Sequence, residues 1–208
     1  MNILQLNSSA RRVQDGQGSY SSRLATELVE GLKKTADAKG ALTVRDLGLD
    51  PHPAMDEAAL GALFTPADKR SAEQAERVAA NDALIAELFA HDAIVIATPM
   101  INFGVPTQLK NWIDAVARAG TTFSYGATGP VGLVTGKKVY VVVATGGVHR
   151  NQATDGITPY LRTVLGFLGM TNIEFIYAEG LAMGPEAEAA GVAGARAQIA
   201  ELIGAVAA

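Results

Sequence analysis

The stretch DAIVIATPMINFGVPTQLKNWID, residues 92–114, decides the fold because it joins a strand, a loop and a helix in that order. The run AIVIA (93–97) is apolar without a break, which is typical of a strand buried on both faces of a parallel sheet. Residues 107–118 carry apolar side chains at helical spacing, which predicts a helix packed on that sheet. Between them, PMINF (99–103) places large apolar side chains and a carboxamide in a loop, where we expect a ligand to cover them.

The same order of strand and helix recurs along the chain. Further strands are predicted over 1–7, 41–47, 139–145 and 173–180, and further helices over 23–34, from 71 onward, over 157–169 and from about 185 to 206. The glycine-rich segment 121–138 predicts an inserted hairpin, and 48–72, rich in Pro, Asp, Ala and Gly, predicts a long surface excursion. Five alternations without a repeat or linker predict one three-layer α/β domain over 1–208 with a five-stranded parallel sheet.

Composition and charge exclude several classes of protein. The 208 residues are 49% hydrophobic and 18% charged, which is an ordinary globular composition. The formal net charge of -4, without a local Lys/Arg cluster, argues against a nucleic-acid partner. The chain has no cysteine, which excludes disulfides, thiolate metal sites and thiol redox chemistry, and we expect no metal. No apolar stretch approaches the ~20 residues that span a bilayer, and no leader-like segment precedes the first strand, so we expect a cytoplasmic protein without membrane insertion.

Three loops with unusual content follow the predicted strands. They cover residues 8–22, 98–106 and 145–156. In an open parallel sheet, ligands bind beyond the carboxyl ends of the strands, near the point where the strand order reverses. We therefore expect the three loops to form one shared site.

The first loop indicates a phosphate site. It holds five serines, and it leads into a helix whose N-terminus favours an anion. These serines are Ser8, Ser9, Ser19, Ser21 and Ser22. The alternative is that one of them only caps the helix. The pattern GxxxxGK[ST] is absent, and GQGSYS (16–21) has two of the three glycines of GxGxxG, so a mononucleotide phosphate fits better than a nucleoside triphosphate or a tightly held dinucleotide.

The third loop, ATGGVHRN (144–151), has a glycine pair directly after a buried strand. Two residues without Cβ atoms let the backbone approach a flat ligand, although a plain turn would need the same residues. His149 lies just beyond the pair, where it either makes a structural hydrogen bond or contacts the ligand.

Several motifs in the same order resemble the FMN-dependent NADH-azoreductases, flavodoxin-like flavoproteins that also reduce quinones. The motifs are PMINF (99–103), TQLKNWID (107–114), VARAGTTF (116–123), GPVGLVTGKK (129–138) and GGVH (146–149). TVRDL (43–47), TPYL (158–161) and AEG (178–180) extend the resemblance over nearly the whole chain.

The resemblance implies a flavodoxin-like fold with strand order 2-1-3-4-5 and a homodimer with FMN near the interface. It implies a ping-pong cycle in which NADH, or alternatively NADPH, donates two electrons to the flavin, and a quinone or azo compound then accepts them. Phosphate contacts are implied for Ser9, Ser19, Tyr20 and Ser21. Ring contacts are implied for Met100, Ile101, Asn102, Phe103, Ala144, Thr145, Gly146 and Gly147, with His149 beside them. The resemblance also implies that Tyr125, Phe167 and Tyr177 shape the side of the site where the substrate binds.

The flavin itself carries the chemistry in this hypothesis, so no side chain is required as nucleophile or general base. We expect Asn102 and the glycine pair to bind the polar edge of the ring, and solvent or His149 to supply protons. Many relatives have Tyr at position 101 and Ser-Arg at 144–145, where this chain has Ile101, Ala144 and Thr145. These departures affect the substrate side more than cofactor binding.

Three other functions share the predicted fold. A flavodoxin-type electron carrier would bind FMN without oxidising NADH itself, but such carriers tend to be shorter and more acidic and lack the insertion at 121–138. A quinone reductase with no role toward azo dyes, or a flavin-dependent sensor, would use the same site.

The sequence leaves the choice between NADH and NADPH open. Arg11, Arg12 and Arg150 either contact the 2′-phosphate of NADPH or are simply solvated.

Overall fold

The structure, a computed structural model, describes residues 1–35 and 40–207, the last of these by its backbone alone. A five-stranded parallel sheet forms its centre, in the order β2-β1-β3-β6-β7. The strands are β1 (Ile3–Asn7), β2 (Leu42–Asp46), β3 (Ala93–Pro99), β6 (Lys138–Ala144) and β7 (Asn172–Ala178). Because β4 and β5 form a separate hairpin, this is the predicted order 2-1-3-4-5, and the flavodoxin-like fold is confirmed.

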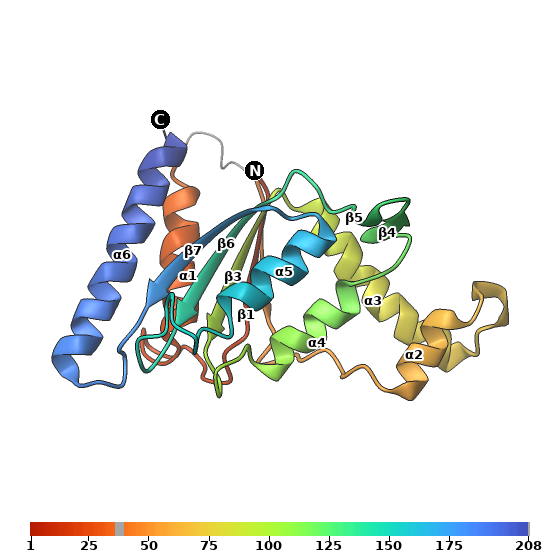
Figure 1. Cartoon of the computed structure of the whole chain (residues 1–208), viewed down its shortest axis with the longest axis horizontal. Helices are drawn as coiled ribbons and strands as arrows, with labels where there is room; N and C mark the ends of the chain where they lie inside the picture. Colours follow the sequence, from red (N-terminus) through yellow and green to blue (C-terminus); the bar gives the residue numbers. More distant parts are fainter. Residues whose placement is uncertain (36–39, 208) are drawn as a thin grey trace.

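Helices cover both faces of the sheet, which gives three layers (Figure 1). One face carries α1 (Tyr20–Leu32) and α6 (Pro185–Ala207), and the other carries α3 (Ala72–Ala90), α4 (Thr107–Val116) and α5 (Thr158–Leu168). Side chains of β3 alternate between the two cores: Ile94 and Ile96 pack with α4 and α5, whereas Val95 and its neighbouring alanines pack with α1. The unbroken apolar run of β3 therefore does fill both faces of the sheet.

The first helix begins earlier than predicted. The expected range was 23–34, whereas α1 covers Tyr20–Leu32. Ser19 is the N-cap, and its Oγ accepts a hydrogen bond from the backbone N–H of Ser22 at 3.2 Å. The polar residues at 20–22 carry no apolar pattern, so periodicity alone placed the start of the helix too late.

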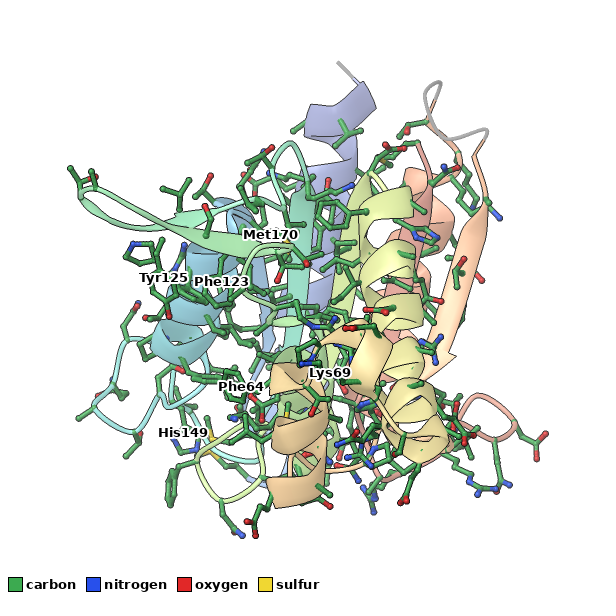
Figure 2. The ribbon with its side chains drawn as sticks, turned by 90° about the vertical axis from the view of Figure 1, so that its right-hand side faces the viewer. Phe64, Lys69, Phe123, Tyr125, His149 and Met170 are labelled. Atoms are coloured by element: carbon green, nitrogen blue, oxygen red, sulfur yellow. The ribbon has the colours of Figure 1, made fainter. Side chains whose placement is uncertain are left out.

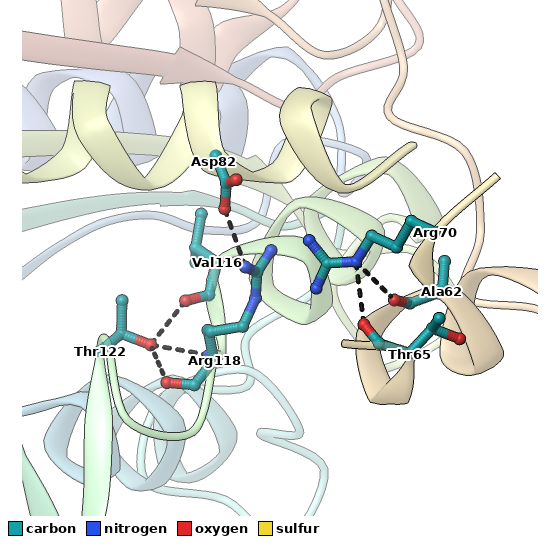
Figure 3. Close-up of polar contacts among 7 residues, drawn as sticks. All are labelled: Ala62, Thr65, Arg70, Asp82, Val116, Arg118 and Thr122. Carbon is teal, nitrogen blue, oxygen red and sulfur yellow. Dashed lines mark hydrogen bonds and ion pairs between the residues drawn. The ribbon is translucent and has the colours of Figure 1, made fainter. Parts of the chain in front are cut away.

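The segment 48–72 is not only a surface excursion. It contains α2 (Glu57–Phe64) and a 3₁₀ turn (Ala67–Lys69). The Asp56 side chain caps α2, and Arg70 Nε donates to the carbonyl oxygens of Ala62 (3.2 Å) and Thr65 (3.0 Å) at its end (Figure 3). The sequence of α2, EAALGALF, is apolar on all sides and so lacks the contrast between an apolar and a polar face by which a surface helix is usually predicted.

The predicted hairpin is confirmed as β4 (Phe123–Gly126) and β5 (Gly129–Gly132). Thr122 fixes its entry: the Oγ1 donates to Val116 O at 2.7 Å and accepts from Arg118 N at 2.8 Å (Figure 3). The Arg118 side chain in turn bonds Asp82 of α3 at 2.8 Å. At the other end of the hairpin, Gly132 lies against the backbone of Gly169, and a Cβ at position 132 would come within 2.1 Å of the Gly169 backbone nitrogen.

In the described residues, no helix combines the length and apolarity that a bilayer span requires.

Candidate functional site

The three loops expected to share a site do begin side by side. Asn7 of β1 pairs with Ala97 of β3, and Pro99 of β3 pairs with Ala144 of β6. All three strands run in the same direction, so their following loops gather at one edge of the sheet, where the arrowheads of Figure 1 end. This is the edge at which an α/β sheet of this order binds ligands.

The three serines implied as phosphate contacts are buried in the first loop, and two of them lie at the start of α1. Ser9, Ser19 and Ser21 are all buried, and the Oγ atoms of Ser19 and Ser21 lie 3.2 Å apart. In the described residues, nothing accepts the backbone N–H groups of Ser19, Tyr20 and Ser21. Ser8 is different, since its hydroxyl donates to Ala97 O at 2.8 Å and so joins two strands. Free N–H groups and hydroxyls at a helix N-terminus suit a phosphate.

Tyr20 is held by a second helix. Its hydroxyl donates to the carboxylate of Glu188 on α6, and the Arg23 guanidinium lies 4.6 Å from the centre of its ring. The hydrogen bond to Glu188 raises the pKa of Tyr20 above its ordinary value. The hydroxyl of Tyr20 is therefore already engaged in a hydrogen bond, so Tyr20 can contact a ligand at the first loop through its backbone N–H.

The second loop is a tight turn with strained backbone. Ile101 and Gly104 exchange N–H···O bonds of 2.9 and 3.0 Å, and the two residues between them, Asn102 and Phe103, have φ angles of 47° and 68°. A left-handed Phe is unusual and costs on the order of 1–2 kcal/mol, which is typical of functional sites. The turn leaves Ile101 51% exposed and Phe103 58% exposed, while Met100 packs against the core.

In the third loop, the carbonyl groups of the glycine pair accept hydrogen bonds, whereas the N–H groups of the pair donate none within the described residues. The carbonyl of Gly147 accepts from Thr145 Oγ1 (2.7 Å) and Gly180 N (3.0 Å), and that of Gly146 accepts from Ala182 N (3.0 Å). Within the described part of the chain, nothing accepts the N–H groups of Gly146 and Gly147. The loop therefore presents hydrogen-bond donors, which favours a ligand edge that carries acceptors or negative charge. Ala144, at the end of β6, accepts from Met100 N at 2.9 Å and joins this loop to the second.

Glu179 holds the third loop from the end of β7. One carboxylate oxygen accepts the backbone N–H groups of His149 (2.6 Å) and Arg150 (2.8 Å). The sequence did not predict this contact, because the two partners are 29 or 30 positions away along the chain. The only signal was the AEG motif, which was recognised as part of the family resemblance and not for this role.

His149 and Tyr177 lie at the same edge. The His149 ring meets Phe103 edge to face, with ring centres 5.8 Å apart, and its Nδ1 lies 2.9 Å from Thr154 Oγ1. The Tyr177 hydroxyl lies 2.8 Å from Thr158 Oγ1, and burial raises the pKa of Tyr177. The structure thus places both residues beside the second and third loops.

Tyr125 and Phe167 lie at the hairpin, away from the three loops. Both flank Phe123 of the hairpin, with ring centres 5.6 Å (Tyr125) and 4.4 Å (Phe167) from it. Phe167 is nine positions after Thr158 on α5, which is about 13 Å along the helix axis. In Figure 2, His149 appears at the lower left with Phe123 and Tyr125 well above it. Within one chain these two aromatic residues are not part of the loop site.

A model of the flavodoxin-like fold family matches residues 1–203. The chain belongs to this family. It is 62% identical over 203 residues to an FMN-dependent NADH:quinone oxidoreductase of Leptothrix cholodnii, covering 98% of this chain and 97% of the relative. It is 57% identical to a protein of the same name from Dechloromonas aromatica, covering 98% and 100% of the two chains. The family resemblance read from the motifs is therefore confirmed.

Solved structures agree with this assignment. An azoreductase from Bacillus anthracis superposes with a TM-score of 0.86 at 25% identity, covering 97% of this chain and 98% of that one. A second Bacillus anthracis protein, an FMN-dependent NADH-azoreductase in complex with FMN, superposes with a TM-score of 0.89 at 23% identity over both full chains, which supports the fold alone.

The residues at the edge of the sheet fit FMN. Hydroxyls and free N–H groups lie at the start of α1, an exposed apolar turn lies beyond β3, and further free N–H groups lie beyond β6. The groups at α1 suit a phosphate, the apolar turn suits an aromatic ring system, and the N–H groups beyond β6 suit the polar edge of that ring. In the described residues, no group of three His, Asp or Glu side chains lies close enough together to bind a metal ion.

Proposed function

We propose that this chain is an FMN-dependent NADH:quinone oxidoreductase that also reduces azo compounds, and that residues 1–208 act as one FMN-binding domain. The observation that carries the proposal is the free N–H groups of the third loop, which face the same edge of the sheet as the exposed apolar turn at Ile101–Gly104. A reaction in the cytoplasm, where NADH is available, fits this activity.

The phosphate of FMN would bind the first loop. Ser9, Ser19 and Ser21 would donate or accept through their hydroxyl groups, and the N–H groups of Ser19, Tyr20 and Ser21 would complete the cradle. Tyr20 would act through its backbone alone, since Glu188 already accepts its hydroxyl.

The ring would lie between the second and third loops. Bound FMN supplies the hydride chemistry, taking two electrons from NADH and passing them to an acceptor. The N–H groups of Gly146 and Gly147, together with the Asn102 carboxamide, would bond the polar edge of the ring, with Ala144 and Thr145 lining the base of the loop. Donors fixed there stabilise negative charge, so the loop favours the reduced form of the ligand.

Apolar side chains would keep water from the ring. Met100 is partly buried and packs against the core at the base of the loop, while Ile101 and Phe103 are exposed. His149 lies against Phe103 and would move a proton to the acceptor, with solvent as the other source. Tyr177 would close the adjacent side.

We propose a homodimer that covers this surface. Ile101 and Phe103 are more than half exposed next to the site, and the hairpin and α2 expose Tyr125 (77%) and Phe64 (80%), which is unusual for aromatic side chains of a monomer. Figure 2 shows both α2 and the hairpin on the side turned to the viewer. Tyr125 and Phe167 would serve the substrate side only if a second copy brought its hairpin to this chain's ring.

The test is a steady-state assay on the FMN-loaded protein, with NADH and a quinone varied together and an azo dye as second acceptor. Parallel lines in double-reciprocal plots, and no turnover without FMN, are expected. A protein that binds FMN and exchanges electrons with a redox partner, yet does not oxidise NADH, would be a flavodoxin-type carrier and would overturn the proposal.

A further inference from the structure

Helix α6 connects the first loop to the end of β7, from which the third loop is held. It lies beside α1 on the same face of the sheet (Figure 1). At the start of α1, the Tyr20 hydroxyl donates to the carboxylate of Glu188 on α6. Within one further turn of α6, Gly191 lies so close to the backbone after β7 that a Cβ there would come within 2.1 Å of Glu179 O. Because Glu179 holds the third loop, the first turns of α6 contact the anchors of both loops.

The hydrogen bond between Tyr20 and Glu188 joins a neutral hydroxyl to a charged carboxylate, which makes it stronger than one between neutral groups. It raises the pKa of Tyr20 above its ordinary value, so the hydroxyl keeps its proton and remains a donor at neutral pH. In the described residues, the Glu188 carboxylate has no other hydrogen-bond or ion-pair partner. A carboxylate close to a phosphate site repels the phosphate by its charge, so any benefit of Glu188 there must come from the position of Tyr20.

Arg23 extends this contact into the loop that precedes α1. Its guanidinium lies 4.6 Å from the centre of the Tyr20 ring, and its Nη1 donates to Gly16 O at 2.8 Å. The chain between Gly16 and Tyr20 is thus held at both ends. It contains Ser19, the N-cap of α1, whose hydroxyl and N–H belong to the proposed phosphate cradle.

We propose that Glu188 is a positioning residue for the phosphate of FMN, on which it acts through the Tyr20 side chain and the first turn of α1. The inference rests on the proposed function, since it concerns the same cofactor site. FMN carries its phosphate at one end and its ring at the other, so both ends bind together only when the first and third loops are held at the right separation. Donors that are fixed in advance cost less ordering on binding. Riboflavin has the same ring but no phosphate, so Glu188 contributes to the affinity for FMN and little to the affinity for riboflavin.

The test is a fluorescence titration of the flavin-free protein with FMN and, separately, with riboflavin. Glu188→Ala leaves the Tyr20 hydroxyl without its acceptor and is expected to weaken FMN binding about tenfold, while riboflavin binding changes by less than about twofold. Glu188→Gln keeps an oxygen that accepts the Tyr20 hydroxyl, so it should retain most of the FMN affinity. A merely structural role of Glu188 would weaken the binding of both flavins alike.

Tyr20→Phe tests the same hydrogen bond from its other side. The variant keeps the ring that lies against Arg23 and loses only the hydroxyl, so its FMN affinity should fall as far as that of Glu188→Ala. The double variant should bind FMN no more weakly than either single variant, because the two residues act through one hydrogen bond.

Glu27→Ala is the matched control. Glu27 forms a second contact between α1 and α6, in which both carboxylate oxygens accept from Arg196 at 2.8 Å. Its removal changes the net charge by the same amount as Glu188→Ala, but Glu27 lies about two turns along α1 from Tyr20. FMN binding of this variant should equal that of the wild-type protein.

Equal weakening of FMN and riboflavin binding by Glu188→Ala would overturn the inference, as would unchanged or tighter FMN binding in that variant or an equal loss in Glu27→Ala. Additive losses in the double variant would overturn it as well. NADH oxidation by the FMN-loaded wild-type protein, measured on the same preparation, tests the proposed function separately, because a protein can bind FMN at this site without oxidising NADH. A wild-type protein that binds neither flavin would overturn both.

Discussion

Glu179 accepts the backbone N–H of His149 at 2.6 Å, and this bond joins the end of β7 to the loop that follows β6. The same oxygen holds Arg150 N at 2.8 Å. With these two N–H groups engaged, those of Gly146 and Gly147 are left free in the same loop. Glu179 is thus a positioning residue, which acts on the ligand site through the backbone of the loop.

Glu179→Ala should therefore weaken FMN binding about tenfold, because it leaves two N–H groups without an acceptor. Glu179→Gln keeps an acceptor oxygen and should retain most of the affinity. Glu174→Ala, on the strand that leads to Glu179, removes a partly exposed ion pair to Lys138 and is the matched control, with no expected effect on FMN binding. Fluorescence titration of the apoprotein with FMN measures all three, and an equal loss in the Ala and Gln variants would refute the role.

Asn102→Ala should weaken FMN binding or slow reduction by NADH. The side chain projects from the exposed turn and, in the described residues, has no hydrogen-bond partner of its own, so its removal breaks no contact; because Ala tolerates the φ of 47° less well than Asn, we still expect a loss of about 1 kcal/mol in folding stability. Stopped-flow reduction together with the FMN dissociation constant checks this. Wild-type values for both would contradict a contact between Asn102 and the ring.

Phe103→Asn separates stability from function. Asn tolerates the left-handed backbone better than Phe does, and the lost side chain is 58% exposed, so thermal unfolding should show a protein that is no less stable and gains up to about 1 kcal/mol. FMN binding should weaken, since the turn loses its aromatic side chain. A clear drop in stability would mean that the contact of Phe103 with His149 outweighs the backbone strain.

His149→Ala should affect mainly the half-reaction with the acceptor. The ring lies against Phe103 and would deliver a proton to the product, whereas hydride transfer from NADH needs no proton from the protein. Each half-reaction is measured separately by stopped flow. The assignment fails if both slow by the same factor.

The buried tyrosine of β6 predicts how stability depends on pH. Burial raises the pKa of Tyr140 above its ordinary value of 10.0. The folded chain then holds this proton more tightly than the unfolded chain, so the stabilisation is complete below pH 10.0 and is lost as the pH rises through the folded-state pKa. Urea unfolding on both sides of that pH should show the loss, and Tyr140→Phe should make it shallower. An identical pH dependence in the variant would exclude Tyr140 as the source.

The sheet and the convergence of three loops at one of its edges could be predicted from sequence because each depends on local pattern. The run at 93–97 is apolar on both faces, and polar or glycine-rich loops follow the strands directly. Contacts between distant residues leave no such pattern: Tyr20 meets Glu188 across 168 positions, and Glu179 meets the glycine loop across 29 or 30. Helix α2 escaped prediction because its sequence, EAALGALF, is apolar on all sides and shows no helical alternation of apolar and polar residues.

The visible spectrum of the purified protein, taken before NADH, after NADH and then after a quinone, tests the central claim most directly. We predict a yellow protein whose flavin bands are bleached by NADH and restored by the quinone. A colourless protein that neither binds added FMN nor consumes NADH would contradict the account.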